Sequence, residues 1–240
     1  MKLYGLIGKT LDHSFSKSYF ENKFISEHIQ NASYSNFPLE SIEEFKSLIK
    51  KTTFRGLNVT IPYKSSIIPF LDELSTEATA IGAVNTVVKK DEKWIGHNTD
   101  WIGFYESIKP LLQKHHKKAL VLGRGGASKA IVYALKKLKI KPLIISRKEG
   151  YTNYAEITKD LLVEHLIIVN CTPVGTYPKT DEYPPIPYEL LSKKHLLYDL
   201  IYNPSESRFL KYGKANKAKI KNGLEMLQRQ AEAAWSIWNS

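Results

Sequence analysis

Several polar residues in the first half of the chain could together bind a small alcohol and change its oxidation state. They lie near the ends of predicted elements and are Ser14, Ser16, Thr60, Lys64, Asn85, Thr99 and Asp100. Removal of a hydride from a secondary alcohol requires a group that takes up the hydroxyl proton, and a lysine beside an aspartate can do this. Hydroxyl and amide side chains suit a ligand that carries a carboxylate and hydroxyls. Each residue alone has an ordinary explanation as a cap, a turn or a surface residue, so the whole set is what indicates an oxidoreductase.

Lys64 ends the segment GLNVTIPYK, which covers residues 56–64. Its apolar residues predict a buried strand that stops at Pro62, and a helix is expected from about Pro62 to Leu74. A lysine just after a strand usually lies on the surface, and that interpretation stays open for Lys64 taken alone. The alternative is that the strand delivers an ammonium group to a site where negative charge develops.

A glycine-rich turn separates the apolar strand at 118–122 from an amphipathic helix that starts near Ser128. Its glycines are Gly123, Gly125 and Gly126. A dinucleotide pyrophosphate binds to backbone N–H groups at a helix N-terminus, and a Cβ in the turn would keep it away. The pattern departs from G-x-G-x-x-G, because Ser128 replaces the third glycine and Arg124 is bulky. An ordinary tight turn is therefore the alternative interpretation.

The end of the next predicted strand favours NADP over NAD. An acidic residue about 20 positions after the glycine turn would bind the ribose hydroxyl of NAD, whereas arginine favours the phosphate of NADP. The residues here are Ser146, Arg147 and Lys148, and the first carboxylate is Glu149. Two cations beside a phosphate dianion indicate NADP. The alternative is that Arg147 and Lys148 only keep a strand end soluble.

The elements that position these residues alternate between strands and helices, which favours an α/β fold. The strands expected in the first half are at 2–8, 33–39, 56–61, 83–90 and 93–100, and the helices are at 16–28 and 41–51. A connecting helix at 101–112 and a basic linker lead to the second half. There a strand, a helix and a second strand require a right-handed crossover and a parallel sheet. Further strands are expected at 166–173 and 195–202, and a helix closes the chain.

Composition and charge limit the possible classes of function. The 240 residues carry a net charge of +11, but the lysines are scattered in short patches, as on solvated helix faces. Aromatic residues are not interleaved with these patches, so a nucleic-acid partner is not expected. The chain has no run of 18 apolar residues, and its first residues lack an apolar stretch and a small-residue cleavage site. A cytoplasmic protein without a signal peptide or a membrane span is therefore expected. Cys171 is the only cysteine, so no intramolecular disulfide can form.

Eight segments resemble shikimate dehydrogenase in their order and spacing, and they span essentially the whole chain. They are HSFSKS (13–18), GLNVTIPYK (56–64), IGAVNTVV (81–88), GHNTDWIGF (96–104), LGRGGASKA (122–130), NCTPVGTYP (170–178), YDLIYNP (198–204) and NGLEMLQRQA (222–231). The resemblance implies an oxidoreductase that interconverts shikimate and 3-dehydroshikimate with NADP, on the route to chorismate and the aromatic amino acids. It also implies two α/β domains with a cleft between them. These are a substrate domain at 1–101, on which a C-terminal helix at 224–240 packs, and a Rossmann-like NADP-binding domain at 102–223.

The resemblance assigns roles by position. Lys64 and Asp100 match the catalytic pair. The positions that match substrate contacts are Ser14, Ser16, Thr60, Asn85, Thr99, Tyr202 and Gln230. The positions that match cofactor contacts are Gly123, Arg124, Gly125, Gly126, Ala127, Ser146, Arg147, Lys148, Thr172, Leu200 and Gly223. No metal is expected, and the protein is expected to be a monomer or a homodimer.

The chain departs from the family's usual pattern at three positions. Lys17 replaces a proline, Arg124 replaces a small residue and Ser146 replaces an asparagine, and the cofactor half is shorter than in typical members. The changes at Arg124 and Ser146 touch the cofactor site. NAD is therefore a possible cofactor. A quinate dehydrogenase or a dual-specificity enzyme on the same scaffold is the first alternative. A non-catalytic basic binding protein on the same fold is the remote one.

Overall fold

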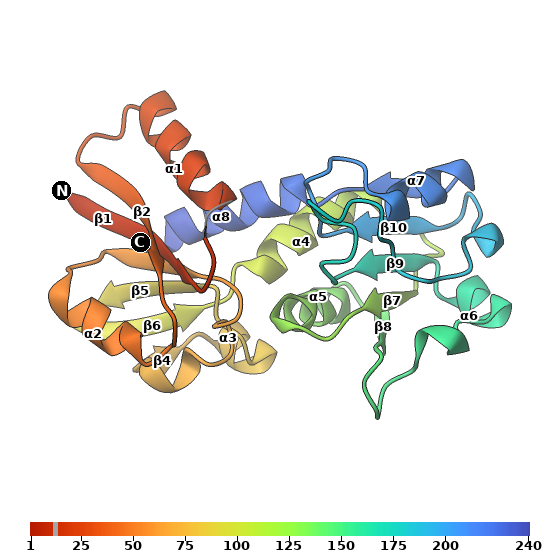
Figure 1. Ribbon diagram of the computed structural model, residues 1–240, viewed down its shortest axis with the longest axis horizontal. Helices are drawn as coiled ribbons and strands as arrows, with labels where there is room; N and C mark the ends of the chain where they lie inside the picture. The colour runs from red at the N-terminus through yellow and green to blue at the C-terminus, as the bar shows by residue number, and fades with distance from the viewer. Residues whose placement is uncertain (12–13) are drawn as a thin grey trace. The chain divides into compact units, whose positions relative to one another are not determined.

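The computed structural model describes residues 1–11 and 14–240, and Figure 1 shows its helices and strands. The chain forms two compact units, one made of residues 1–99 and 230–240 and the other of residues 100–229. The boundaries drawn from the sequence lay after residues 101 and 223, whereas the units change over after residues 99 and 229. His13, which begins the first of the eight segments, lies outside the described residues.

The first unit is built on a mixed sheet of six strands. These are β1 (Lys2–Gly8), β2 (Ala32–Pro38), β3 (Gly56–Val59), β4 (Glu73–Leu74), β5 (Thr86–Lys90) and β6 (Lys93–His97), in the order β2-β1-β3-β5-β6-β4. β1 pairs in parallel with β2 and β3, and the antiparallel hairpin of β5 and β6 joins the sheet beside β3. This unit also contains the helices α1 (Phe15–Ser26), α2 (Glu44–Lys51) and α3 (Thr76–Ile81).

Apolar side chains cover both faces of this sheet, because successive residues of a strand point to opposite faces. Leu6 and Val88 belong to one buried cluster, and their neighbours Ile7 and Val87 belong to the other. The end of the C-terminal helix α8 (Leu224–Trp238) completes the first of these clusters. Its buried Trp238 donates a hydrogen bond from the indole Nε1 to the Val87 carbonyl at 3.0 Å.

Gly56 is required where β3 passes under the Trp238 ring. A Cβ on Gly56 would lie 2.1 Å from the indole Cδ1. The side chains of Tyr4 and Phe20 also contact Trp238, with ring centroids at 5.0 and 5.3 Å. Such aromatic contacts contribute about 0.5–1.5 kcal/mol each beyond the area they bury. The end of α8 is therefore part of the core of the first unit.

The helix expected from Pro62 to Leu74 is wrong. Turns occupy residues 61–67, a short 3-10 helix η1 spans Ile68–Phe70, and β4 follows and pairs with β6. Proline lacks a backbone N–H and clashes with the preceding helical turn, so Pro69 prevents a continuous α-helix. Pairing of β4 with the sheet then fixes the end of the segment. Lys64 consequently lies in a turn and not on a helix.

The second unit contains a fully parallel sheet in the order β11-β10-β9-β7-β8. Its strands are β7 (Lys118–Leu122), β8 (Lys141–Ile145), β9 (Ile167–Asn170), β10 (Leu196–Asp199) and β11 (Lys219–Lys221). The helices are α4 (Asp100–Ile108), α5 (Gly126–Lys137), α6 (Lys159–Glu164) and α7 (Arg208–Ala215), with the 3-10 helices η2 (Lys109–Leu111), η3 (Tyr154–Glu156) and η4 (Tyr188–Leu190). Two apolar clusters contain alternate residues of β7, such as Val121 and Leu120, so both faces are buried. The predicted α/β class is confirmed.

The strand order of this sheet reverses between β7 and β9. β8 lies on one side of β7, whereas the later strands β9, β10 and β11 follow one another on the other side. This is a doubly wound arrangement, in which ligands bind outside the carboxyl ends of the strands at the point of reversal. The glycine turn after β7 lies at that point.

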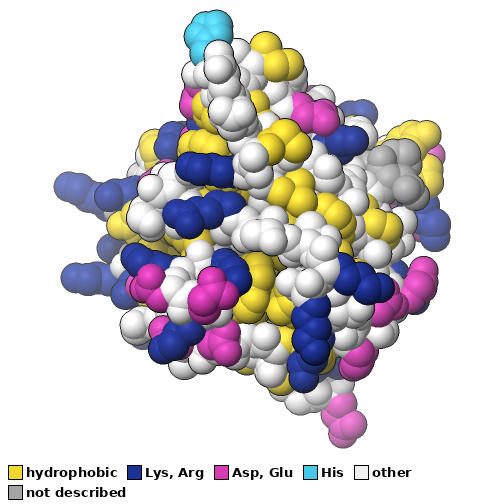
Figure 2. All heavy atoms as spheres, turned by 90° about the vertical axis from the view of Figure 1, so that its left-hand side faces the viewer, with side chains coloured by type: hydrophobic (Ala, Val, Ile, Leu, Met, Phe, Trp, Pro, Cys, Tyr) yellow, Lys and Arg dark blue, Asp and Glu magenta, His cyan; other side chains and the backbone are white. Residues whose placement is uncertain are grey.

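The surface carries mixed charge. On the face shown in Figure 2, Lys and Arg side chains are interspersed with acidic and apolar ones and do not form a single stripe. Exposed ion pairs occur in the first unit, for example Lys9 with Glu40 at 3.6 Å, and such pairs contribute little to stability. Among the residues that the structure describes, none of the helices has the length and apolar character needed to cross a membrane.

Candidate active site

Asn85 is the centre of a buried cluster of amide and hydroxyl groups in the first unit. Its Oδ1 accepts a hydrogen bond from the Thr99 backbone N–H at 2.6 Å. Its Nδ2 donates to Thr99 Oγ1 at 3.0 Å and to Gln230 Oε1 at 3.2 Å. Asn85 precedes β5, Thr99 follows β6, and Gln230 lies in α8. The hairpin and the C-terminal helix thus bring together three of the residues expected to bind substrate.

The Asn85 cluster continues through residues that the sequence did not single out. Asn58, on β3, donates from Nδ2 to the Asn85 carbonyl at 3.2 Å and to Thr86 Oγ1 at 3.3 Å. Tyr34, on β2, donates from its hydroxyl to Asn58 Oδ1 at 2.8 Å. Burial raises the pKa of Tyr34, against the effect of a hydrogen bond with Ser16, so the phenol keeps its proton and remains a donor. One sequence signal could have revealed this extension of the Asn85 cluster: Asn58 is a lone polar residue inside an otherwise apolar strand.

Thr60 and Lys64 both follow the end of β3. Thr60 follows the strand directly, and its backbone N–H donates to the Ile7 carbonyl at 2.9 Å. Lys64 is half-buried, and its carbonyl accepts a hydrogen bond from the Val84 N–H at 2.6 Å. Because Val84 precedes Asn85, this bond holds the backbone of Lys64 beside the segment that enters the Asn85 cluster.

Asp100 is the first residue of α4 and follows Thr99 in the chain. Its side chain is only 6% exposed. An acidic residue in the first turn of a helix interacts favourably with the helix dipole, which suits Asp100 to this position.

Ser14 and Ser16 lie at the start of α1. Ser14 occupies the N-cap position, but its side chain caps no helix N–H. Among residues 1–11 and 14–240, the buried Ser14 Oγ has no hydrogen-bond partner. Ser14 lines a pocket of about 500 Å³, whose wall also includes the cations Lys9 and Lys17. A buried hydroxyl that lacks a partner costs about 1–3 kcal/mol, so a bound carboxylate would satisfy this group.

In the second unit, the residues expected to bind cofactor all follow carboxyl ends of the parallel strands. Gly123, Arg124, Gly125, Gly126 and Ala127 come after β7, Ser146, Arg147 and Lys148 after β8, Thr172 after β9, Leu200 after β10 and Gly223 after β11. Tyr202, expected at the substrate, also follows β10. Parallel strands present their carboxyl ends at one edge of a sheet, which is where doubly wound proteins bind ligands. The structure therefore collects these residues along one edge.

The glycine turn has the geometry that a pyrophosphate needs. Gly123 has a φ of +102°, and a Cβ there would lie 3.0 Å from Thr172 Cγ2, so the turns after β7 and β9 pass close to each other. Gly125 is the N-cap of α5, and a Cβ added to it would meet no atom within 4 Å. The space before the first turn of α5 is thus open. The N–H groups of that turn point into this space and carry partial positive charge.

The loop after β8 holds two exposed cations. Ser146 is 6% exposed, and its backbone N–H donates to the Thr152 carbonyl at 2.9 Å, which joins the two ends of the loop. Its Oγ accepts a hydrogen bond from the Lys148 N–H at 3.2 Å. Arg147 and Lys148 are therefore presented by a closed loop, and this arrangement fits a phosphate dianion.

A buried carboxylate, which the sequence did not single out, connects the ends of β9 and β10. Asp199 is fully buried and accepts hydrogen bonds from Ser207 Oγ at 2.5 Å, from the Ile201 N–H at 3.0 Å and from Asn170 Nδ2 at 3.0 Å. Asn170 Oδ1 in turn accepts from Thr172 Oγ1 at 2.7 Å. Burial raises the pKa of Asp199 to about 6, against the three hydrogen bonds, which lower it. This network positions the turn that carries Thr172.

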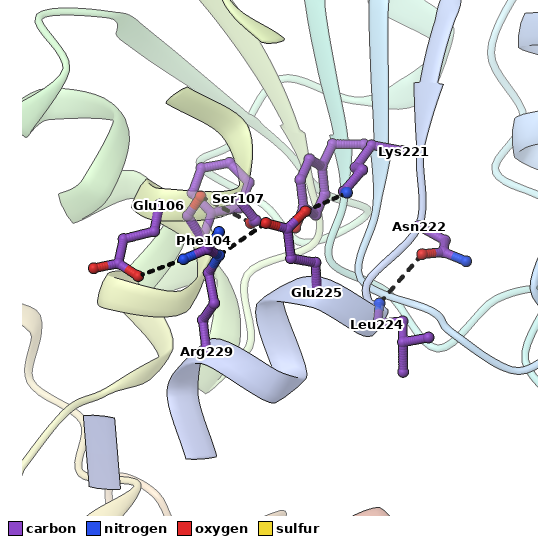
Figure 3. A network of polar contacts seen from close by, with 9 residues as sticks. Phe104, Glu106, Ser107, Lys221, Asn222, Leu224, Glu225 and Arg229 are labelled. Carbon is purple, nitrogen blue, oxygen red and sulfur yellow. Dashed lines mark hydrogen bonds and ion pairs between the residues drawn. The ribbon is translucent and has the colours of Figure 1, made fainter. Parts of the chain in front are cut away.

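Charged side chains anchor the start of α8, as Figure 3 shows. Glu225 pairs with Lys221 and accepts from Arg229 Nε at 2.8 Å, and Arg229 also contacts Glu106 at 3.2 Å. Just before the helix, a Cβ on Gly223 would lie 2.1 Å from the Leu200 carbonyl oxygen, so only glycine fits. This close approach joins the segments after β10 and β11.

Comparison with known proteins gives a consistent result. The sequence model of the shikimate dehydrogenase substrate binding domain matches residues 6–87. The protein named shikimate dehydrogenase (NADP(+)) in Caldicellulosiruptor bescii is 39% identical over 259 residues, which cover 99% of this chain and 89% of that protein.

Two solved structures extend the comparison to the fold. Shikimate 5-dehydrogenase from Thermus thermophilus, in complex with NADP(H) and shikimate, has a TM-score of 0.88 and 31% identity over 99% of this chain and 93% of its own. Quinate dehydrogenase from Corynebacterium glutamicum, in complex with NAD, has a TM-score of 0.86 and 26% identity over 99% of this chain and 93% of its own. The fold, together with the glycine turns at the carboxyl edge of the parallel sheet, thus places the chain among the α/β dinucleotide-dependent oxidoreductases. Given its similarity to the Caldicellulosiruptor protein over nearly the full length, the chain belongs to the shikimate dehydrogenase family.

Proposed function

We propose that this chain is a shikimate dehydrogenase, which reduces 3-dehydroshikimate to shikimate with NADPH and catalyses the reverse reaction with NADP⁺. The observation that supports this most directly is the Asn85 cluster, in which Asn85, Thr99 and Gln230 meet. Neutral amide and hydroxyl groups suit the hydroxyls of a small ring. The relatives that carry the name shikimate dehydrogenase (NADP(+)) support the same reaction.

The unit of residues 1–99 and 230–240 binds the substrate in this proposal. Ser14 and Ser16 hold the carboxylate, consistent with the unpartnered Ser14 Oγ and the cations of the adjoining pocket. The hydroxyls are held by the remaining substrate residues, which are Thr60, Asn85, Thr99 and Gln230, and Tyr202 contributes from the loop after β10.

Lys64 and Asp100 are the proposed catalytic residues. NADPH, when bound, supplies the hydride. In the direction of reduction, the Lys64 ammonium donates a proton to the carbonyl oxygen as that oxygen becomes an alcohol. In the direction of oxidation, the Lys64 amine takes up the proton that the substrate hydroxyl releases, and the resulting ammonium stabilises the negative charge that develops on the oxygen. Asp100 orients the reacting hydroxyl. A preorganised charge at this position stabilises a transition state by several kcal/mol.

The unit of residues 100–229 holds the cofactor. The turn from Gly123 to Ala127 binds the pyrophosphate through backbone N–H groups, since Gly125 leaves the space before α5 open. Ser146, Arg147 and Lys148 bind the phosphate of the adenosine ribose. Thr172 also contacts the cofactor, and Leu200 and Gly223 contact its nicotinamide end.

The test is a set of four turnover assays on the purified protein, with shikimate or quinate as substrate and NADP⁺ or NAD⁺ as cofactor. Reduction of the cofactor is followed by absorbance. Shikimate with NADP⁺ is expected to give the highest kcat/KM. A higher value with quinate and NAD⁺ would instead favour a quinate dehydrogenase, the candidate supported by the similarity to the Corynebacterium protein.

If none of the four assays shows turnover and the protein binds DNA in a salt-sensitive way, the result would support the remote alternative, a non-catalytic basic binding protein. A cytoplasmic location, and a monomer or homodimer, stay predictions, and sedimentation of the purified protein would test the second.

A further inference from the structure

Arg124 and Tyr151 form a contact at the edge of the second unit to which no role has been assigned above. The Arg124 guanidinium lies 5.4 Å from the centre of the Tyr151 ring, within the range of a cation–π interaction. Arg124 belongs to the turn after β7, and Tyr151 belongs to the loop after β8. These strands are neighbours, with Leu122 paired to Ile145. The contact therefore connects two adjacent loops that both begin at the same edge.

The direction of the Arg124 side chain separates two possible roles. In doubly wound folds the pyrophosphate lies at the start of the helix after the first strand, and the adenosine ribose lies at the end of the second strand. Arg124 sits in the pyrophosphate turn, but its guanidinium extends toward Tyr151 in the loop of the second strand. The positive charge is thus displaced from the pyrophosphate position toward the ribose position.

The loop that Arg124 approaches also contains Arg147 and Lys148. The bond between the Ser146 N–H and the Thr152 carbonyl closes this loop, and Tyr151 directly precedes Thr152. We propose that Arg124 is a specificity-determining residue that binds the 2′-phosphate of NADP together with Arg147 and Lys148, and that Tyr151 is the positioning residue that holds its guanidinium there. This inference rests on the proposed function, because it presumes a dinucleotide at this edge.

An aromatic partner suits this role better than a carboxylate would. A ring attracts a guanidinium by its face and leaves the cationic charge and the N–H donors available to a phosphate. A carboxylate would neutralise the charge and occupy those donors. Glu149 is the only carboxylate in residues 146–152, against the two cations of the loop itself. Tyr151 is 39% exposed, which is consistent with a ring that lies beside a solvent-accessible binding site.

The test measures binding of NADP⁺ and NAD⁺ by isothermal titration calorimetry, because the two ligands differ only by the 2′-phosphate. Arg124→Ala is expected to raise the Kd for NADP⁺ by about tenfold, the scale of a lost charge-assisted hydrogen bond. The Kd for NAD⁺ is expected to change by less than about twofold. Tyr151→Leu is expected to weaken NADP⁺ about threefold through the lost ring, whereas Tyr151→Phe keeps the ring and binds as the wild type does.

Lys137→Ala is the matched control. Lys137 lies 5.4 Å from the centre of the Tyr133 ring, the same distance as in the proposed pair, but at the opposite end of α5. The Lys137→Ala substitution removes one positive charge and one cation–π contact but leaves the loops after β7 and β8 unchanged. It is therefore expected to leave the Kd values of NADP⁺ and NAD⁺ unchanged. Circular dichroism of each variant checks that it is folded.

Equal weakening of NADP⁺ and NAD⁺ by Arg124→Ala would assign the residue to the pyrophosphate and overturn the inference. Unchanged binding of both would make Arg124 a surface residue and overturn it as well. Turnover of shikimate by the wild type with NADP⁺ is measured separately. If the wild type turns over shikimate and Arg124→Ala gives one of these two binding results, only the role of Arg124 is contradicted. If the wild type does not turn over shikimate but Arg124→Ala weakens NADP⁺ selectively, only the proposed reaction is contradicted.

Discussion

The two units assemble their candidate binding groups in different ways. In the first unit, the Asn85 cluster consists of side chains that hydrogen-bond one another, and its three central members are Asn85, Thr99 and Gln230. In the second unit, the edge of the parallel sheet offers backbone N–H groups and turns that require glycine, such as Gly123 and Gly223. Side chains can be chosen singly to recognise one small ligand, whereas a backbone cradle recognises the shared chemistry of a dinucleotide.

The networks under these groups also differ in charge. The Asn85 cluster rests on the neutral residues Tyr34, Asn58 and Thr86. The edge of the second unit rests on the buried carboxyl of Asp199. The comparison therefore predicts that changes in the first unit alter substrate turnover and that changes in the second alter cofactor binding and the response to pH.

Lys64→Ala is expected to produce the largest effect. It should lower kcat by at least ~10²-fold, the scale of lost acid–base assistance, with little change in KM for shikimate. Steady-state kinetics measure this, and Lys50→Ala is the control, because Lys50 is an exposed lysine on α2 of the same unit. A variant with near-normal kcat would remove the catalytic role of Lys64.

The second prediction concerns pH and the buried Asp199, whose pKa is raised to about 6 from an ordinary 3.8. Between these values the folded protein holds a proton that the unfolded chain has released. The contribution of Asp199 to stability is therefore largest at low pH and falls as pH rises through this window. A shift of this size corresponds to at most about 3 kcal/mol.

Urea unfolding of the wild type and of Asp199→Asn, from about pH 4 to pH 7, measures this effect. As pH rises, the unfolding free energy of the wild type should fall relative to that of the variant, which has no carboxyl at this position. A difference that stays constant across the range would show that Asp199 does not titrate there.

Arg147→Ala is expected to weaken NADP⁺ by about 10- to 30-fold, because a guanidinium binds a phosphate through charge-assisted hydrogen bonds. NAD⁺ should be weakened far less. Titration of both cofactors measures the ratio, and Lys159→Ala on α6 serves as the control for lost charge. Equal losses for the two cofactors would remove Arg147 from the phosphate site.

Two glycines provide a matched pair for the backbone cradle. Gly125→Ala should leave the unfolding free energy nearly unchanged, because its Cβ would meet nothing within 4 Å, yet weaken NADP⁺ about tenfold by occupying the pyrophosphate position. Gly223→Ala should instead destabilise the fold, because its Cβ would lie 2.1 Å from the Leu200 carbonyl oxygen. Thermal unfolding and cofactor titration separate the two outcomes, and a Gly125→Ala protein with normal affinity would contradict the cradle.

Tyr34→Phe is expected to have the smallest effect. It removes the donor to Asn58 Oδ1 and should cost about 1 kcal/mol of unfolding free energy. KM for shikimate should rise slightly, and the Kd for NADP⁺ should not change, since Tyr34 belongs to the first unit. A change in the Kd for NADP⁺ as large as the change in KM would contradict the expectation that the first unit affects only the substrate.

The first part of the second unit could be predicted from the sequence because its signals are local, whereas the helices α6 and α7 were not predicted. The strand, glycine turn and helix follow one another within residues 118–137, and Arg147 and Lys148 follow the next strand. The roles of Asn85 and Gln230 could not be derived in this way. These residues are 145 positions apart, and only the resemblance to the family indicated that both contact one substrate.

The network residues were missed for a related reason. Asn58, Thr86 and Asp199 are polar residues in or beside apolar strands. Such a residue can be noticed, as Asn58 could be, but the local sequence does not show which distant group it bonds. The predicted helix at 62–74 was wrong because a pattern of apolar residues does not show that Pro69 ends it or that residues 73 and 74 pair with β6. The short elements β4 and β11 depend on such pairing and were not predicted.

The position of Trp238 has a consequence for how the protein is made. Its ring lies against Gly56 in the core of the first unit, only two residues from the end of the 240-residue chain. Domains usually fold in order as the amino-terminal part leaves the ribosome. Here the first unit cannot complete its core until Trp238 has been made, so the intervening 130 residues of the second unit, 100–229, emerge before that point and can fold first.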